Sequence, residues 1–165
     1  TLIFLHMLFD PFLKILFIAS FSLLMVSNIS AQNRKKTKKI DRVIAEGRRY
    51  IGTPYRYGGM SKSGIDCSGL IYNCYKTIDV ILPRTAKDQS KIGSSKTWDS
   101  IRPGDIVYFK FKQKGEKWYH AGMITYAEKD DIRFVHASTR SGVIESSLMD
   151  SYYMNNVKKF RRVIK

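Results

Sequence analysis

The chain has 165 residues, and its 29 Lys and Arg against 14 Asp and Glu give a net charge of +15, which suggests an anionic partner without naming one. With 44% hydrophobic and 13% aromatic residues it has enough apolar material for a core, which excludes general disorder. The length fits one domain, and two cysteines exclude a disulfide-rich scaffold, a four-cysteine zinc site and an iron–sulfur protein.

Residues 1–31 are typical of a secretory signal peptide. Lys14 precedes a short apolar run, residues 15–26, and small or polar residues follow up to Ala31. We therefore expect cleavage after Ala31 and export to the periplasm or cell envelope. The run is shorter than the roughly 20 apolar residues of a membrane span, so an uncleaved anchor is the weaker alternative. No cysteine lies near the cut, so a lipoprotein is not expected.

Residues 32–39 are expected to form a basic linker, which leaves residues 40–165 as the folded domain. The predicted signal carries one acid and one base, so the exported part keeps the whole positive charge. This favours anionic envelope polymers or lipid headgroups as partners. Nucleic-acid binding is the alternative. We do not expect it, because export argues against it and a charge run is most often a solvated tail.

The first half of the domain has helical periodicity. Residues 40–51 are expected to form a helix that ends at Gly52, followed by a loop rich in Gly and Tyr. Asp66 is a candidate N-cap for a central helix, and Pro83 introduces a short third helix over residues 85–92. One apolar stripe marks the central helix: Cys67, Leu70, Ile71, Cys74, Tyr75 and Ile78.

The second half has the pattern of strands. After a turn at residues 102–105, three strands are expected, with the polar segment 127–131 joining the second and third. Helices followed by antiparallel strands indicate an α+β domain. The expected strands are 106–111, 119–126 and 132–138, with weaker candidates at 142–145 and 159–164 and a short helix at 148–155.

Cys67 is a candidate nucleophile because it lies in the first turn of the central helix. Unpaired backbone N–H groups there are expected to stabilise a thiolate and lower its pKa. The alternative is a buried core cysteine, and Cys74 on the same stripe is interpreted as one. Seven residues of helix rise about 10.5 Å, beyond the roughly 7 Å limit for a disulfide, so the two cysteines are not expected to pair.

His120 and His136 lie in the second and third strands of the same predicted hairpin. They are either directly opposite each other or diagonal neighbours, depending on register, and both registers keep the rings within reach. With Cys67 they supply a nucleophile, a base and a group that orients the base. A zinc site on these three residues is the rival interpretation, weakened by the lack of a closely spaced ligand pair.

An ordered series of motifs then resembles the NlpC/P60 family. It covers about residues 40–164, nearly the whole of the expected mature chain, and looks most like the small single-domain murein endopeptidases of bacterial envelopes. The motifs are Gly52-Thr53-Pro54-Tyr55-Arg56-Tyr57-Gly58-Gly59, Gly64-Ile65-Asp66-Cys67-Ser68-Gly69-Leu70, Leu82-Pro83-Arg84-Thr85, Pro103-Gly104-Asp105-Ile106-Val107-Tyr108-Phe109, His120-Ala121-Gly122-Met123-Ile124 and Phe134-Val135-His136-Ala137-Ser138.

The resemblance implies a papain-like α+β fold, with N-terminal helices packed on a C-terminal antiparallel sheet. It also implies that Cys67, His120 and His136 are the catalytic cysteine, base and third polar residue. Tyr55 is implied near the oxyanion, and Asp66 and Ser68 in the substrate cleft. Two simpler interpretations stay open, an ordinary loop aromatic for Tyr55 and a helix cap for Asp66. One departure is Tyr57, where many members carry Trp, which would alter the cleft wall.

The activity implied by the resemblance is that of a cysteine endopeptidase, acting on peptidoglycan stem peptides or cross-links. The Cys67 thiolate would form an acyl-enzyme with the help of His120, without a metal or cofactor, in a protein expected to be a monomer. Both the bond between D-Glu and the diamino acid and a cross-link between stems are compatible substrates. A non-catalytic wall-binding module, and an amidase or acyltransferase using the same thiol, are the alternatives.

Overall fold

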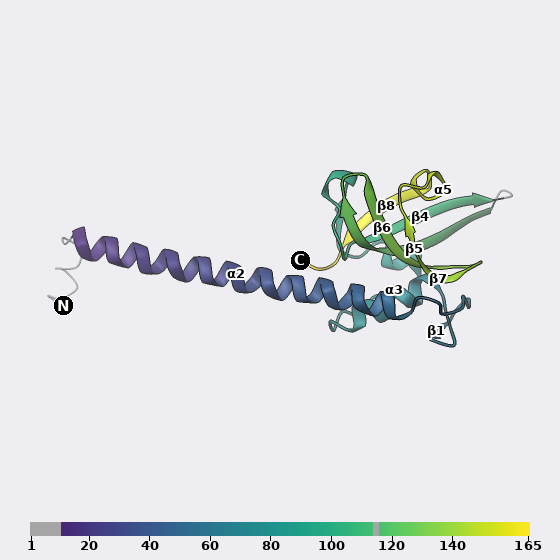
Figure 1. The fold of residues 1–165 in the computed structure, drawn as a ribbon, viewed down its shortest axis with the longest axis horizontal. Helices are drawn as coiled ribbons and strands as arrows, with labels where there is room; N and C mark the ends of the chain where they lie inside the picture. The colour runs from purple at the N-terminus through teal and green to yellow at the C-terminus, as the bar shows by residue number, and fades with distance from the viewer. Residues whose placement is uncertain (1–10, 114–115) are drawn as a thin grey trace. The chain divides into compact units, whose positions relative to one another are not determined.

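The computed structural model of the chain describes residues 11–113 and 116–165. Its contacts divide the chain into two units, residues 1–37 and 38–165. Helix α2 (Pro11–Arg49) contains the described part of the first unit and continues into the second (Figure 1). No helix among the described residues is long and apolar enough to cross a membrane. Cleavage after Ala31 remains a prediction, and residues 1–10 of the predicted signal lie outside the described residues.

The second unit contains helices followed by an antiparallel sheet, as the α+β prediction required. In the six-stranded sheet the order is β3-β8-β4-β5-β6-β7, and every pairing is antiparallel. After α2, the second unit contains these helices and strands in chain order: β1 (Met60–Ser61), β2 (Gly64–Ile65), α3 (Cys67–Lys76), α4 (Ala86–Gln89), β3 (Ser94–Lys96), the 3-10 helix η1 (Trp98–Ser100), β4 (Ile106–Gln113), β5 (Glu116–Glu128), β6 (Asp131–Ser138), β7 (Gly142–Ser147), α5 (Ser151–Met154) and β8 (Val157–Arg162).

The predicted elements are present, but several of their ends differ. The expected loop 127–131 is mostly strand, since β5 and β6 pair as far as Glu128 and Asp131 and leave a tight turn between them. Strand β8 begins and ends two residues earlier than predicted. The short helices were predicted too long, because only residues 86–89 and 151–154 are helical. Strands β1, β2 and β3 were not predicted, since two or three residues are too few to show a period.

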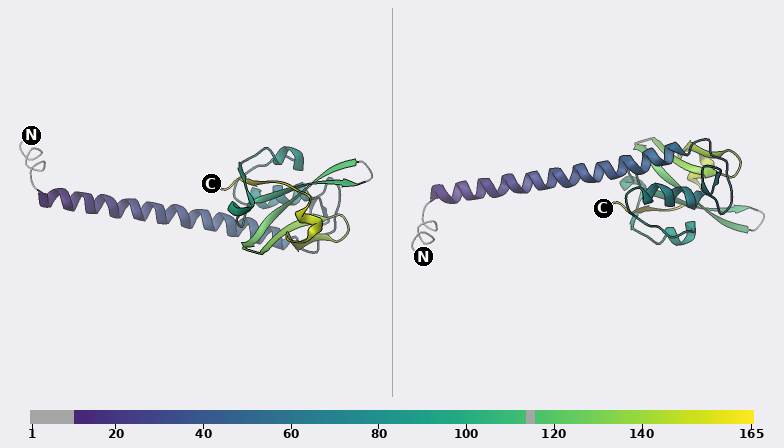
Figure 2. Two further views of the ribbon diagram at one scale, coloured as in Figure 1. Left: turned by 90° about the horizontal axis from the view of Figure 1, so that it is seen from above. Right: turned by 90° about the horizontal axis from the view of Figure 1, so that it is seen from below.

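Alternation along the strands gives the sheet two apolar faces. One face packs against α3 and the C-terminal end of α2, and the other packs against α5 and its preceding loop. Figures 1 and 2 show the two helices together on one side of the sheet and α5 on the other. The first face includes Tyr108, Ala121, Met123 and Val135, and the second includes Phe109, Phe111, Ile124 and Phe134.

The end of α2 differs from the predicted helix in one respect. Val43 and Ile44 are buried as expected, but Ile51 lies beyond the helix end and is 50% exposed. Tyr50 is buried in its place. Gly47 faces the core so closely that an added Cβ would lie 2.9 Å from Val135 Cγ1. A larger residue there would therefore separate α2 from the sheet that carries the candidate site.

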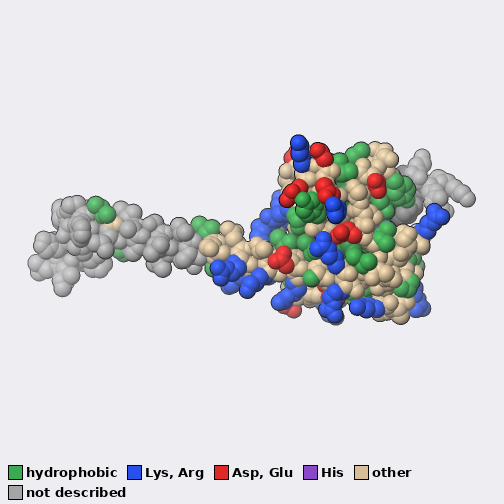
Figure 3. Space-filling model, viewed as in Figure 1, with side chains coloured by type: hydrophobic (Ala, Val, Ile, Leu, Met, Phe, Trp, Pro, Cys, Tyr) green, Lys and Arg blue, Asp and Glu red, His purple; other side chains and the backbone are tan. Residues whose placement is uncertain are grey.

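The charged side chains of the second unit are mixed on the face shown in Figure 3. Lys and Arg side chains are interspersed with Asp and Glu over that face. The basic residues of the predicted linker include exposed side chains at Arg34, Lys35, Lys38 and Lys39. The linker supplies five positive charges, and residues 40–165 carry 23 Lys and Arg against 13 Asp and Glu, so both parts contribute to the predicted attraction to an anionic partner.

Candidate active site

Cys67 is the first residue of α3, and the residue before it fixes the start of that helix. Asp66 has an extended backbone, and its carboxylate accepts a hydrogen bond of 2.7 Å from the Gly69 N–H, as an N-cap does. Gly69 is required because a side chain there would collide with the Gly59 carbonyl. The predicted cap is thereby confirmed, and it sets the direction in which the Cys67 side chain leaves the helix.

Cys67 is 8% exposed, and its thiol lies against the backbone N–H of Ala121 in strand β5. The pKa of Cys67 is raised to about 11, mainly by burial and also by the Asp66 carboxylate, and backbone N–H groups of Ala121, Ser68 and Cys67 only partly offset this rise. The expectation of a lowered pKa at the helix start is therefore wrong for this thiol, because desolvation outweighs the N–H groups. The contact with the Ala121 N–H places the peptide bond between His120 and Ala121 at the thiol.

His120 and His136 come together on neighbouring strands. Gly122 pairs with His136, so the two histidines are diagonal neighbours, the second of the two predicted registers. The Nε2 atom of His120 lies 2.9 Å from the Nδ1 atom of His136. The rings are nearly perpendicular, with an angle of 88° between their planes, and a third ring, Phe134, stacks on His136. The sequence therefore predicted this pair correctly.

Both histidines are held in the uncharged form. His120 is 5% exposed and His136 is 1% exposed. Burial, together with the neighbouring His136, lowers the pKa of His120 to about 3. Burial likewise lowers the pKa of His136 to about 4. At neutral pH the unliganded site therefore contains a neutral thiol and two neutral imidazoles.

Tyr55 and Cys67 line the same open pocket, which has a volume of about 340 Å³. The pKa of Tyr55 is raised by burial and by its proximity to Cys67, so the hydroxyl keeps its proton and can donate a hydrogen bond. Tyr57 is 90% exposed at the same pocket. Asp66, Ser68, Arg84 and Tyr119 also line it. The histidine pair lines a second, smaller cavity of about 50 Å³ with Phe111, Tyr152 and Tyr153.

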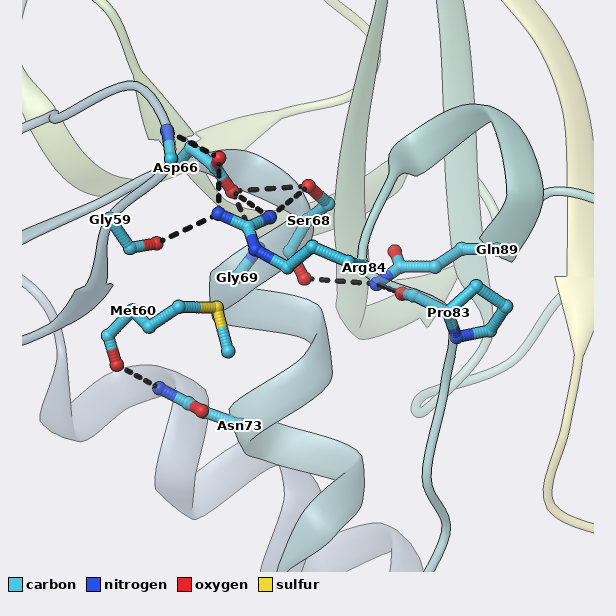
Figure 4. Close-up of polar contacts among 10 residues, drawn as sticks. Gly59, Met60, Asp66, Ser68, Gly69, Asn73, Pro83, Arg84 and Gln89 are labelled. Carbon is cyan, nitrogen blue, oxygen red and sulfur yellow. Dashed lines mark hydrogen bonds and ion pairs between the residues drawn. The ribbon is translucent and has the colours of Figure 1, made fainter.

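Asp66 and Ser68 use most of their hydrogen-bonding capacity within the protein (Figure 4). The guanidinium of Arg84 donates to both carboxylate oxygens of Asp66, at 3.0 and 2.7 Å, and to Ser68 Oγ at 2.9 Å. Ser68 Oγ in turn donates to Asp66, and the Gly58 N–H completes the set. These bonds lower the pKa of Asp66 against the opposing effect of burial. The network favours a structural role for Asp66 and Ser68 in holding the first turn of α3, and contact with substrate remains a prediction for both.

Four residues around the site were not assigned a role from sequence. Arg84 lies in one of the motifs that resemble the family, but its contact with Asp66 could not be predicted from the sequence. Gln89 is fully buried and donates from Nε2 to the Ser68 and Pro83 carbonyls, both at 2.9 Å. Ser146 and Tyr153 contact His136 from β7 and α5. Ordinary polar residues at such separations give no signal in a single sequence.

The two cysteines remain unpaired. Cys67 and Cys74 are both free thiols, and Cys74 is completely buried in the core between α3 and the sheet. Among the described residues, no group of three or more His, Cys, Asp and Glu is arranged to hold a metal ion. The structure therefore gives the zinc interpretation no geometric support.

Comparisons with known proteins agree with this arrangement. A profile of the NlpC/P60 family matches residues 52–162. The chain is 41% identical to a probable endopeptidase NlpC of Escherichia coli K12 over 113 residues, covering 68% of this chain and 70% of that protein. It is 35% identical to the murein DD-endopeptidase MepS/murein LD-carboxypeptidase of the same strain over 124 residues, covering 74% of this chain and 62% of that protein.

A solved structure is similar over the same region. An NlpC/P60 family protein from Bacillus cereus ATCC 10987 matches with a TM-score of 0.67 and 27% identity, covering 76% of this chain and 40% of that one. The predicted NlpC/P60 fold, with helices packed on an antiparallel sheet, is thereby confirmed. The chain belongs to the NlpC/P60 family.

Proposed function

We propose that this protein is a cysteine endopeptidase that hydrolyses amide bonds in peptidoglycan stem peptides or cross-links. The observation that carries the proposal is the meeting of Cys67, at the start of a capped helix, with the strand that bears His120. One relative is named as a probable endopeptidase and another as a murein DD-endopeptidase, and these names support a hydrolase acting on peptidoglycan. The open pocket of about 340 Å³ at Cys67 is large enough for part of a peptide.

The first step is attack of Cys67 Sγ on the amide carbonyl of the peptide. Because burial raises the pKa of the thiol to about 11, the proton must leave as the sulfur attacks. His120, neutral at the same pH, is the proposed base. The new bond between Sγ and the carbonyl carbon gives a tetrahedral intermediate, and the proton transfer gives an imidazolium at His120.

The negative oxygen of that intermediate needs hydrogen-bond donors. The backbone N–H of Cys67 belongs to the first turn of α3, where N–H groups have no acceptor within the helix. The hydroxyl of Tyr55, which keeps its proton, is the proposed second donor. Both groups border the pocket that contains the thiol.

Collapse of the intermediate breaks the C–N bond. The His120 imidazolium gives its proton to the leaving amine, and the acyl group remains on Cys67 as a thioester. A water molecule gives a proton to His120 and attacks the thioester carbonyl. The C–S bond then breaks, which releases the new carboxyl group and returns the proton from His120 to Cys67 Sγ. Throughout these steps His136 accepts a hydrogen bond from His120 Nε2 and fixes the ring.

Export and wall association are part of the same proposal. The predicted signal peptide would deliver the enzyme to the periplasm or envelope, and the basic linker would hold it near anionic polymers or headgroups. The side chains of that linker include exposed positive charges at Arg34, Lys35, Lys38 and Lys39. Such attraction would be weakened by salt, because exposed charges are screened.

The test uses the full chain with purified peptidoglycan. The wild type and Cys74→Ala are expected to release soluble peptide-containing fragments, whereas Cys67→Ala releases none. Cys74 is the matched control because it lies on the same helix and is also a buried free thiol. The masses of the products identify the bond. Equal release by Cys67→Ala would overturn the proposal, as would binding of the wild type to the wall with no bond cleaved.

A further inference from the structure

The side of His136 that faces away from His120 carries a second pair of polar groups. Its Nε2 atom lies 3.1 Å from Ser146 Oγ and 3.2 Å from the Tyr153 hydroxyl. Ser146 also hydrogen-bonds to Tyr153, which lowers the pKa of the tyrosine against the larger, opposite effect of burial. The two histidines and two hydroxyls therefore form one connected hydrogen-bond network.

The strands and the short helix bring these groups to one place. Ser146 pairs with Phe134 across β6 and β7, which puts its side chain on the same face as His136. The Tyr153 ring, from α5, packs edge-on against His136 at 5.3 Å and against Phe134 at 4.9 Å. Because the ring is held by these contacts, its hydroxyl has a fixed position at Nε2.

The position of the protons in this hydrogen-bond network decides whether His120 can act as a base. A neutral imidazole has one donor nitrogen and one acceptor nitrogen. If His136 carries its proton on Nδ1, it donates to His120 Nε2, and His120 must then carry its own proton on Nδ1. If His136 carries it on Nε2, its Nδ1 accepts from His120 Nε2–H, and His120 Nδ1 is the basic nitrogen.

The same requirement holds after the proton transfer. When His120 is an imidazolium, both of its nitrogens are donors, and Nε2–H again needs the His136 Nδ1 as acceptor. The proton of His136 must therefore stay on Nε2 in every step. A buried N–H without an acceptor is unfavourable, so loss of the acceptors at Nε2 would favour the opposite tautomer.

We infer that Ser146 and Tyr153 are positioning residues, which accept the His136 Nε2–H and so keep His136 in the tautomer that makes His120 a base. In this arrangement His120 Nε2–H donates to His136 Nδ1, and His136 Nε2–H donates to the two hydroxyls. Neither Ser146 nor Tyr153 lines the pocket that contains Cys67. The catalytic consequence of this inference depends on the proposed function, but the tautomer itself does not.

The test combines a tautomer measurement with kinetics. In the full chain labelled with ¹⁵N-histidine at pH 7, both His120 and His136 are expected to show a protonated Nε2 and an unprotonated Nδ1. The signal of His6 is assigned with His6→Gln. In Ser146→Ala/Tyr153→Phe, His136 is expected to shift to the Nδ1–H tautomer. Dispersed amide signals in the same sample report that the variant is folded.

The kinetic arm uses peptidoglycan fragments as substrate. For the double variant we expect kcat to fall on the order of 100-fold, the lower end of what a general base contributes, with KM little changed. Tyr126→Phe also removes a phenol hydroxyl from the sheet, but Tyr126 is not part of this hydrogen-bond network. This variant is therefore expected to match the wild type. Each single variant leaves one hydroxyl at Nε2, so the double variant is decisive.

Two results would overturn the inference. One is a proton on His136 Nδ1 in the wild type. The other is a folded double variant with unchanged tautomers or unchanged kcat. The tautomer measurement needs no substrate, so it still decides the inference if the wild type fails to cleave peptidoglycan. In that case the proposed function fails, and the arrangement of protons is tested separately.

Discussion

The Nε2 atom of His120 lies 2.9 Å from the Nδ1 atom of His136, and the two rings meet edge to face. One nitrogen of His120 is therefore committed to His136, which leaves Nδ1 as the nitrogen for acid–base chemistry. The pairing of Gly122 with His136 makes this contact possible, because it places the histidines diagonally on one face of the sheet.

The acceptor role of His136 predicts a graded response to substitution. His136→Asn keeps a side-chain oxygen able to accept from His120, whereas His136→Leu fills the space without an acceptor. We expect kcat/KM to fall about 100-fold or more for His136→Leu, within the range of general-base contributions, and by only about 10-fold for His136→Asn. Activity assays at matched folded fractions check this. Equal losses in the two variants would show that His136 acts only by filling space.

The buried histidines predict that stability depends on pH. The pKa values of His120 and His136 fall from 6.5 to about 3 and about 4 on folding. Their contribution to stability is therefore fully present above pH 6.5 and is lost as the pH falls toward 4, because the unfolded chain binds protons that the folded chain does not. The expected loss is about 1.4 kcal/mol per pH unit for each histidine.

Urea unfolding between pH 7.5 and 5 measures this dependence. Over that window the free energy of unfolding of the wild type is expected to decrease as the pH is lowered, and His136→Asn should show about half the slope. Aspartates contribute little there, since their ordinary pKa values lie lower. A free energy that stays constant from pH 7.5 to 5 would contradict the buried neutral pair.

The raised pKa of Cys67 predicts how the thiol reacts with iodoacetamide. With the pKa near 11, the alkylation rate should rise steadily with pH from 6 to 9. A preformed thiolate–imidazolium pair would instead give a rate that levels off in that range. Intact mass of the native protein follows the reaction, and Cys67→Ala reports any labelling of Cys74. A level rate from pH 6 to 9 would show that the thiol is ionised in the free enzyme.

The contact between Arg84 and Asp66 predicts a loss of stability on substitution. Arg84→Gln leaves a carboxylate whose side chain is 8% exposed without its charged partner, and we expect the free energy of unfolding to fall by about 2 kcal/mol. Arg133→Gln is the control, because Arg133 and Asp131 form a similar ion pair with side chains 55% and 45% exposed. Its cost should stay below about 1 kcal/mol. Equal effects in denaturant unfolding would contradict a structural role for Arg84.

The sequence predicted the parts of the site that depend on local patterns. The helix cap at Asp66, the helix start at Cys67 and the pairing of His120 with His136 all follow from spacing along one helix or one hairpin. Strand ends were less well predicted, since polar residues such as Glu128 and Asp131 extend β5 and β6 through pairing with each other. Cross-strand pairing is not visible in the period of one strand.

The remaining features depend on contacts between distant residues. Arg84 reaches Asp66 from a segment 18 residues away, and Tyr153 reaches His136 from 17 residues away. The pKa of Cys67 was predicted in the wrong direction because helix position is visible in a sequence and burial beneath β5 is not. Each of these three features is set by tertiary packing.

The most direct test of the proposed function is cleavage of defined muropeptides, with and without cross-links, followed by mass spectrometry. The wild type and Cys74→Ala are expected to yield two products whose masses sum to the substrate plus one water, and Cys67→Ala is expected to leave the substrate intact. Cleavage by Cys67→Ala at the wild-type rate would contradict the assignment of Cys67 as the nucleophile.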